Sequence, residues 1–288
     1  MSYWSDLHDA LDVIGITKGD IVYVGSDIAG VILGAMRELG FKGRDGQNEY
    51  LNRLIDELKV HVGEEGTLMF PVYNWDFCKG TPFDYYKTQG SVGALNNFVL
   101  NERKDFVRTR HPLYSLMVWG KYAKQLHDMD NQESWGQNSP FAFLHHNGGK
   151  ELDINVNATR SMTFKHYVEQ QTKVPYRYQK FFMGEYTDED GITETRTYSM
   201  YVRRLEVSLE PAQTNEFFAA GDACKEVTFH GLPIYAIDLP KAYDLLQDDL
   251  LHNGGHNVYT FENYDIDWQS EPDTRYQIGF LKDRDVMQ

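Results

Sequence analysis

The chain has 288 residues, of which 41% are hydrophobic, and a formal net charge of −15 at neutral pH. This length and composition suit one large packed domain or two small ones. The negative charge argues against a protein that grips nucleic-acid phosphates, because that work needs a basic surface. It would favour a cationic small substrate, although ordinary solubility is sufficient to explain it.

The sequence contains no run of eighteen apolar residues. Its start, "MSYWSDLHDALDVIG", carries acids where a signal peptide carries basic and apolar segments. We therefore expect a cytoplasmic protein that is neither secreted nor inserted in a membrane. Cys78 and Cys224 lie far apart in sequence, so we expect reduced thiols and no disulfide scaffold.

Strand and helix patterns alternate from the N-terminus onward. A first helix is followed by a Gly-Asp turn and the apolar run "IVYV" at 21–24, which is typical of a buried strand. Apolar residues at helical spacing then predict helices over 29–40 and 47–62, and a second strand, "TLMF", stops at Pro71. This order favours an α/β fold with a largely parallel central sheet flanked by helices.

The alternation continues past the middle of the chain. We expect a helix, a turn with a strand, and two further helices, over residues 91–102, 109–120, 120–130 and 139–147. Ligands of such sheets usually gather in the loops that follow the strands. The candidate binding loops are therefore residues 25–30 and 71–92.

From about residue 178 the character of the sequence changes. Aromatic and β-branched runs flank Asp190-Gly191, which predicts a hairpin and an antiparallel insertion over about 178–230. Residues 230–268 then return to a strand, helix, strand order. Because no linker or low-complexity tract divides the chain, we expect one domain over residues 1–288.

Three common kinds of site find little support. The sequence has no glycine fingerprint of the dinucleotide or P-loop type. The pairs His145-His146 and His252/His256 are better explained as capping or surface histidines, so we expect no metal. Cys78 lies in a candidate loop, where a cysteine nucleophile is conceivable but a packed thiol is the simpler interpretation.

The segment "ATRSMTFKHYVEQQTKVPYR", residues 158–177, reads as a helix ended by a proline. Thr163, His166 and Glu169 recur every three residues, so a helix would present them on one face. A carboxylate beside a histidine orients the ring and stabilises its protonated form, as a general base near neutral pH requires. The pattern alone nevertheless favours a solvated helix face, because such pairs are common.

Five segments in order resemble the motif series of the aminoglycoside 3-N-acetyltransferase family: "EEGTLMFPVYNW", "GSVGALNNFV", "TRHPLYSLMVWGKYA", "WGQNSPFAFLHHNGGKELDINV" and "SMTFKHYVEQQTKVPYR". The segment "LDVIGITKGDIVYVGSD" resembles the family's N-terminal strand, and the resemblance covers about residues 10–182. It implies a fold distinct from that of the widespread small acetyltransferases. It also implies transfer of an acetyl group from acetyl-CoA to a primary amine on a sugar ring, without a covalent enzyme intermediate.

On matching positions, the resemblance implies a catalytic base at His166 with Glu169 as its acidic partner. It places His111 and Ser115, within a His-Pro-x-x-Ser motif, near the thioester. The pantetheine arm of acetyl-CoA would lie along two further segments, which contribute Ser26, Asp27, Pro71, Val72 and Tyr73. Ser115 and Thr163 are the candidate hydroxyl donors to a developing oxyanion, although capping or turn hydrogen bonds would explain them as well.

Two departures from the family pattern bear on the acceptor. Antibiotic-modifying members usually read His-Ser-Ser where this chain reads Gly25-Ser26-Asp27, and an apolar strand where it reads "ELDINVNAT". The residues that could line a cleft for a cationic acceptor are Asp27, Asp76, Asp84 and Asp153, and Thr163 is a further candidate for binding the acceptor. The same departures fit an amino sugar linked to a nucleotide, as in relatives that act in surface-polysaccharide assembly.

The sequence thus predicts an acetyl-CoA dependent N-acyltransferase for an amino sugar or an aminoglycoside, the latter with a role in antibiotic resistance. It predicts no nucleic-acid or membrane partner and leaves a homodimer open. Two rivals remain: a ping-pong acyltransferase that uses Cys78, and a sugar-binding relative without catalysis.

Overall fold

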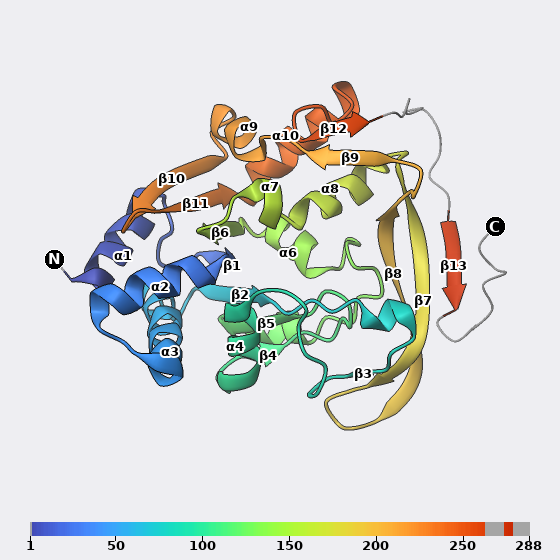
Figure 1. The fold of residues 1–288 in the computed structure, drawn as a ribbon. Helices are drawn as coiled ribbons and strands as arrows, with labels where there is room; N and C mark the ends of the chain where they lie inside the picture. The colour runs from blue at the N-terminus through green and yellow to red at the C-terminus, as the bar shows by residue number, and fades with distance from the viewer. Residues whose placement is uncertain (1, 263–273, 279–288) are drawn as a thin grey trace.

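The computed structural model describes residues 2–262 and 274–278. A seven-stranded sheet of order β10-β11-β6-β1-β2-β5-β4 runs through its centre (Figure 1). Its strands are β1 (Ile21–Ser26), β2 (Thr67–Pro71), β4 (Val107–Arg108), β5 (Leu116–Gly120), β6 (Lys150–Ile154), β10 (Cys224–Phe229) and β11 (Leu232–Asp238).

The predicted α/β class is confirmed, and the sheet is mixed. Parallel pairing joins β1 to β2 and to β6, whereas the strands on both flanks pair antiparallel. The expectation of a largely parallel sheet therefore holds only for these three central strands. On one flank, His230 and Gly231 join β10 to β11, and both residues have a positive φ, as in a tight hairpin turn. Because no helix lies between these two strands, they pair antiparallel.

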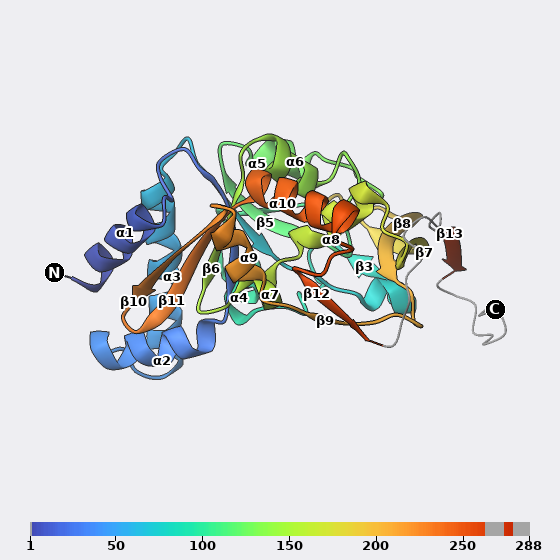
Figure 2. The same ribbon diagram turned by 90° about the horizontal axis from the view of Figure 1, so that it is seen from above.

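Helices cover both faces of this sheet. Along β1, Val22 and Val24 pack into one core and Ile21 and Tyr23 into the other. The first core is closed by α1 (Tyr3–Val13), α2 (Ile28–Leu39), α3 (Gly43–Val62) and α4 (Ala94–Glu102). The second is closed by α5 (Ala123–His127), α6 (Pro140–His146), α7 (Ala158–Ser161), α8 (Phe164–Thr172), α9 (Thr214–Ala220) and α10 (Leu239–His252). Figure 2 shows α5, α6 and α10 together on one side of the strands and α2 on the other.

The helix expected over residues 158–177 is two helices. Between α7 and α8, Met162 leaves the helical conformation with ψ of 89° and is buried in the core. The Ser161 hydroxyl contacts the Asn157 carbonyl oxygen at 2.9 Å and the Asp153 carboxylate at 2.6 Å, which anchors the end of α7. Thr163 consequently stands at the start of α8, where its side chain makes no cap hydrogen bond.

The predicted hairpin is confirmed. β7 (Arg177–Thr187) and β8 (Thr193–Arg203) pair antiparallel over their full length, and Gly191 in the connecting turn has φ of 78°. The opposite edge of β7 pairs in parallel with two short strands, β3 (Phe83–Asp84) and β13 (Thr274–Ile278). Figure 1 shows this hairpin at the end of the molecule opposite to α1 and α3.

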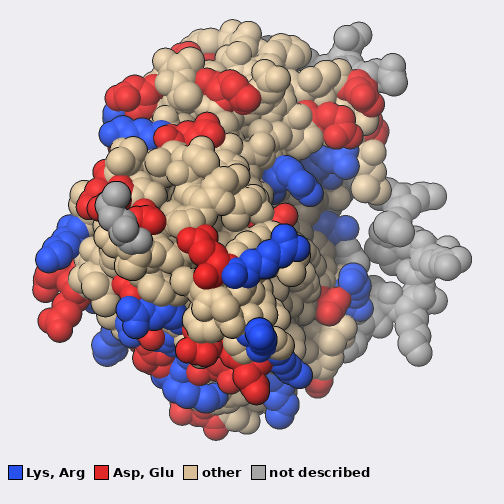
Figure 3. All heavy atoms as spheres, turned by 60° about the vertical axis from the view of Figure 1, so that its left-hand side comes forward, with Lys and Arg blue, Asp and Glu red and all other residues tan. Residues whose placement is uncertain are grey.

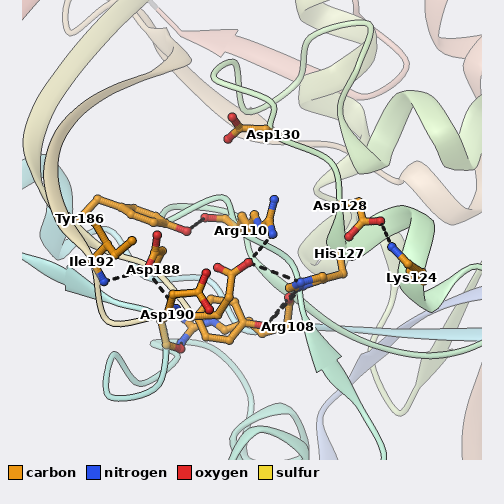
Figure 4. A network of polar contacts seen from close by, with 12 residues as sticks. Arg108, Arg110, Lys124, His127, Asp128, Asp130, Tyr186, Asp188, Asp190 and Ile192 are labelled. Carbon is orange, nitrogen blue, oxygen red and sulfur yellow. Dashed lines mark hydrogen bonds and ion pairs between the residues drawn. The ribbon is translucent and has the colours of Figure 1, made fainter.

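The tip of the hairpin is fixed to the large sheet (Figure 4). Tyr186 donates a hydrogen bond of 2.8 Å to the Arg110 carbonyl oxygen. The Glu189 carboxylate pairs with the Arg110 guanidinium and lies 3.7 Å from Nε2 of His127. Nδ1 of His127 is 2.8 Å from the carbonyl oxygen of Arg108, on β4. The hairpin is thus held at its tip as well as at its base.

A two-stranded sheet of β9 (Ser208–Pro211) and β12 (Tyr259–Glu262) and the 3-10 helix η1 (Asp76–Lys79) complete the described elements. The strand, helix, strand order expected from residue 230 is found as β11, α10 and β12, and its remainder beyond Glu262 lies outside the described residues. That the chain forms a single domain stays a prediction.

None of the helices in the described part of the chain combines the length and apolar character needed to cross a membrane. Acidic and basic side chains are interspersed over the face drawn in Figure 3. On that face, the negative net charge does not gather into one acidic field.

Candidate active site

Helix α8 brings His166 and Glu169 into direct contact. Nδ1 of His166 lies 2.6 Å from Oε2 of Glu169, while the two side chains are 30% and 1% exposed. Because an ionised carboxylate only accepts hydrogen bonds, Nδ1 carries the proton and Nε2 keeps its lone pair. The interpretation as a solvated helix face is therefore wrong for Glu169, which is buried.

Two more side chains hold the Glu169 carboxylate. The Tyr176 hydroxyl donates to Oε1 at 2.8 Å, and Nε of Arg177 lies 2.8 Å from Oε2. Burial alone would raise the pKa of Glu169, but the Arg177 charge, His166 and Tyr176 together lower that pKa to about 2. Glu169 is thus ionised at any pH at which the protein would work.

Arg177 also reaches the histidine. Its Nη2 lies 3.0 Å from Nδ1 of His166. Burial and the Arg177 charge lower the pKa of His166 by more than Glu169 raises it. The ring is therefore a neutral imidazole near pH 7, oriented by a carboxylate and with Nε2 available as a base.

A row of aromatic rings connects the end of β2 to His166. Ring centroids are 4.7 Å apart for Tyr73 and Tyr114, 4.9 Å for Tyr114 and Trp135, and 5.1 Å for Trp135 and His166. The Tyr73 hydroxyl is 2.8 Å from that of Tyr23 on β1. The structure thus brings Tyr73, expected beside the pantetheine arm, into the same packed row as the candidate base.

Thr163 lies at this row as well, with its hydroxyl beside those of Tyr23 and Tyr73. Its position at the start of α8 places it three residues before His166. Among the residues expected at the acceptor, it is the one that the structure puts on the same helix as the candidate base.

The side chains of His111 and Ser115 are buried, and both form hydrogen bonds with other groups of the protein. Nδ1 of His111 accepts the backbone N–H groups of Leu113 and Tyr114, both at 3.2 Å, and burial lowers its pKa to about 3. The Ser115 hydroxyl donates to the Val72 carbonyl oxygen at 3.2 Å. Val72 and Pro71, which ends β2, lie beside β5 through the same pairing. These residues shape the turn after β2, and their contact with a thioester stays a prediction.

Ser26 and Asp27 line a cavity of about 460 Å³ at the carboxyl ends of β1 and β6. The first residues of α2 and α4 border it, and neither helix has a side-chain cap at its N-terminus. Arg160 borders the same cavity and has no ion-pair partner among residues 2–262. Uncapped N–H groups and an unpaired guanidinium favour an anionic ligand there.

The three remaining acids do not share a cleft. Asp76, on η1, pairs with Lys79 at 2.9 Å and borders a separate cavity of about 240 Å³. Asp84 pairs with Lys87 at 2.7 Å in the turn after β3. Asp153 is fully buried beneath α7, and burial raises its pKa to about 7. The expectation of one acidic cleft is therefore wrong, because each acid is engaged locally.

Sequence reasoning missed Tyr176, Arg177, Trp135 and Arg160. Tyr176 and Arg177 lie in "VPYR", just after Lys173 ends α8 in the left-handed conformation with φ of 53°, and both side chains contact α8. The signal was two polar side chains placed just after a helix stop. Trp135 and Arg160 carry no local signal, since their neighbours come from distant parts of the chain.

The described residues show no arrangement suited to a metal ion or to a cysteine nucleophile. No group of three or more His, Cys, Asp or Glu side chains in the described ranges is arranged to hold a metal ion. Cys78 is a free, partly buried thiol on η1. Burial raises the pKa of Cys78 to about 12, so it is not a thiolate at neutral pH.

The fold matches those of several solved structures, aminoglycoside acetyltransferases among them. AAC-IIIb in a binary complex with CoASH superposes with a TM-score of 0.70 at 19% identity, covering 88% of this chain and 97% of that one. Sisomicin-bound AAC-VIa gives 0.68 at 19% identity, over 86% and 97% of the two chains. YokD from Bacillus subtilis gives 0.66 at 18% identity, over 86% and 98%. A search among curated proteins finds no match.

The family profile, together with this fold, defines an enzyme of the N-acetyltransferase class. The sequence profile described as aminoglycoside 3-N-acetyltransferase matches residues 35–250, which is most of the chain. The protein therefore belongs to the aminoglycoside 3-N-acetyltransferase family, as its ordered motifs predicted.

Proposed function

We propose that this enzyme transfers an acetyl group from acetyl-CoA to a primary amine of an aminoglycoside or related amino sugar by direct attack, with His166 as general base. The observation that carries the proposal is the 2.6 Å contact between Nδ1 of His166 and the buried Glu169 carboxylate. That contact fixes the tautomer whose Nε2 can accept a proton.

A base is needed because the acceptor is an amine. An alkylamine has a pKa near about 10 and is mostly protonated at neutrality, so it must lose a proton before or during attack on the thioester carbonyl. Neutral His166 takes that proton at Nε2, and Glu169 stabilises the imidazolium that results. The thiol of coenzyme A leaves as the amide bond forms.

The cosubstrate would enter through the cavity beside Ser26 and Asp27. Its unpaired Arg160 and uncapped helix ends suit the phosphates of coenzyme A. The segment from Asn157 through α7 to Thr163 leads from this cavity to the start of α8. A neighbour of the same fold, AAC-IIIb, is described as a complex with CoASH, which supports this assignment. A cytoplasmic location, where acetyl-CoA is supplied, is part of the proposal.

We favour an aminoglycoside over a nucleotide-linked amino sugar as acceptor. Family membership supports this order, as does the neighbour AAC-VIa, which is described as bound to sisomicin. The nucleotide sugar stays the alternative, because Gly25 and Asp153 depart from the pattern of the antibiotic-modifying members.

The test is acetyl-CoA consumption with a panel that contains aminoglycosides and nucleotide-linked amino sugars. Turnover with members of the first group supports the favoured acceptor, and turnover with the second group alone selects the alternative. A purified protein that binds coenzyme A in calorimetry but turns over neither group would contradict acyl transfer to amino sugars. A protein that does not bind coenzyme A would be the non-catalytic relative.

The ping-pong rival makes a different product on the enzyme. Incubation with acetyl-CoA alone, followed by intact mass measurement, should show no acetyl adduct on Cys78, because its protonated thiol is a poor nucleophile. A Cys78→Ala variant should keep its transfer rate. A stable adduct together with an inactive variant would establish the rival.

A further inference from the structure

Four side chains besides His166 form one buried polar cluster at the base of the hairpin. Glu169 comes from α8, Tyr176 from the position just before β7, Arg177 from the first position of β7, and Tyr259 from β12. All four are less than a tenth exposed. The Arg177 guanidinium in this cluster approaches both His166, the proposed base, and its partner Glu169.

The two contacts of Arg177 have electrostatic effects of opposite sign. Nε of Arg177 is 2.8 Å from a Glu169 oxygen, which is an attraction between opposite charges. Nη2 is 3.0 Å from Nδ1 of His166, an atom that already donates its proton to Glu169. Two donors face each other across that second contact, and their repulsion increases when the ring gains a positive charge.

The charge balance shows what the guanidinium does. With Arg177 present, Glu169 and the neutral ring make a cluster of zero net charge, and protonation of the ring makes it positive. Without Arg177, protonation of the ring would instead neutralise a buried carboxylate. A lone buried carboxylate would therefore hold the imidazole in its charged form, in which it cannot act as a base.

We propose that Arg177 is a positioning residue of the reaction: it keeps Glu169 ionised while preventing that carboxylate from holding His166 as an imidazolium. The mechanistic part of this inference rests on the proposed function. Its electrostatic part concerns the free protein and can be measured without substrate.

Other charges around His166 leave Arg177 as the dominant cation. On α8 itself, Lys165 is buried and lies further along the cluster, with Nζ 5.2 Å from the Tyr259 ring centroid. On the adjoining loop, Trp135 is neutral, and Glu133 is engaged by Gln170 at 2.6 Å. Tyr176, just before β7, and Tyr259, on β12, contribute neutral phenols. Lys165 also lowers the pKa of His166, but less than Arg177 does.

The first test is a titration of the His166 ring by NMR in the free enzyme, with the resonance assigned by His166→Ala. In Arg177→Gln the pKa of His166 should rise by about 1 to 3 units, as expected on removing a neighbouring like charge. Arg177→Lys should restore most of the wild-type value. The matched control is Arg204→Gln, which removes a hairpin arginine that hydrogen-bonds the Pro175 carbonyl oxygen at 2.8 Å and should leave that pKa unchanged.

An unchanged or lower pKa in folded Arg177→Gln would overturn the proposal, as would an equal rise in Arg204→Gln. Because Arg177 also donates to the Tyr201 carbonyl oxygen at 3.1 Å, the glutamine variant could fail to fold. The wild-type protein then decides. With Glu labelled at Cδ, the Glu169 carboxylate should stay ionised from pH 8 to pH 4, and its titration above pH 4 would overturn the proposal.

Activity separates tuning from support of the fold. In Arg177→Gln, kcat/KM at pH 7 should fall with the fraction of His166 that is protonated, by about tenfold for each unit by which the raised pKa exceeds 7, and recover toward wild type by pH 9. An equal loss at every pH indicates a purely structural role and contradicts the proposal. If the NMR shift appears but no variant transfers acetyl groups, the proposed function fails while the electrostatic role of Arg177 stands.

Discussion

A β-carbon at residue 25 would lie 2.2 Å from Oδ1 of Asp153, because Gly25 on β1 and Asp153 on β6 are register partners on adjacent strands. The carboxylate occupies the space that any side chain at position 25 would need. The two segments in which the sequence departs from the family pattern therefore meet at Gly25 and Asp153.

This relationship predicts that Gly25→Ala destabilises the protein by about 1 to 3 kcal/mol through overpacking. Asp153→Ala in the same chain should remove part of that cost, so the two effects are not additive. Unfolding in urea measures both.

Gly34→Ala is the matched control, because a β-carbon there meets open space on helix α2. It should be stabilising by up to about 1 kcal/mol. Equal stability of the Gly25 and Gly34 variants would show that Asp153 does not occupy the space beside residue 25.

Glu169→Gln should separate stability from turnover. Loss of the carboxylate leaves Arg177 buried and unpaired, which should cost about 3 to 5 kcal/mol in unfolding free energy. At temperatures where the variant stays folded, transfer should still fall by about 100-fold or more, because the ring loses its fixed tautomer. The control Glu133→Gln, near the protein surface, should change stability by less than about 0.5 kcal/mol.

Glu151 provides a prediction on pH. It is fully buried with no hydrogen-bond partner on either carboxylate oxygen among the described residues. Burial and the neighbouring Asp153 charge raise the pKa of Glu151 well above its usual range. The folded protein thus binds this proton more tightly than the unfolded chain, and the resulting stabilisation is complete at acid pH and lost as pH rises.

Glu151→Gln should therefore be more stable than wild type at pH 8, by about 1 kcal/mol or more, and the gap should narrow toward pH 5. Chemical unfolding at several pH values measures it. Asp105→Asn is the control of opposite sign, since hydrogen bonding to Arg103 helps to lower the pKa of Asp105 although burial opposes it. That variant should be less stable than wild type at pH 7, and a wider Glu151 gap at pH 5 would refute the account of the buried carboxyl.

The Arg160 cavity predicts a difference between two ligands. Arg160→Gln should weaken coenzyme A binding by about tenfold or more, as loss of one charge-assisted contact to phosphate implies. Binding of pantetheine, which has no phosphate, should be unaffected. Calorimetry measures both, and Arg37→Gln, at the far end of α2, is the control. Equal losses for the two ligands would place the phosphates elsewhere.

Much of the fold was predictable because its signals are local. The apolar run of β1, the stop at Pro71 and the Asp190-Gly191 turn each specify an element without reference to distant residues. The direction of β11 was not predictable, since it depends on the tight turn at His230-Gly231 and on pairing with β6. The break at Met162 depends likewise on the buried Asp153.

The candidate site shows the same division. The helical spacing of His166 and Glu169 was visible in the sequence, and the resemblance suggested their roles. That Glu169 is buried and ionised depends on Tyr176 and Arg177, which approach it after the left-handed end of α8 at Lys173. Spacing alone cannot report burial, so it favoured a solvated face.

The measurement that tests the central claim most directly is single-turnover acetyl transfer by His166→Ala, with wild type and His146→Ala beside it. Transfer to an accepted amine should fall by about 100- to 10,000-fold in His166→Ala while its acetyl-CoA affinity stays near wild type, because a general base has been removed. His146, at the C-terminus of α6, should be dispensable. Wild-type transfer rates in His166→Ala would contradict the account.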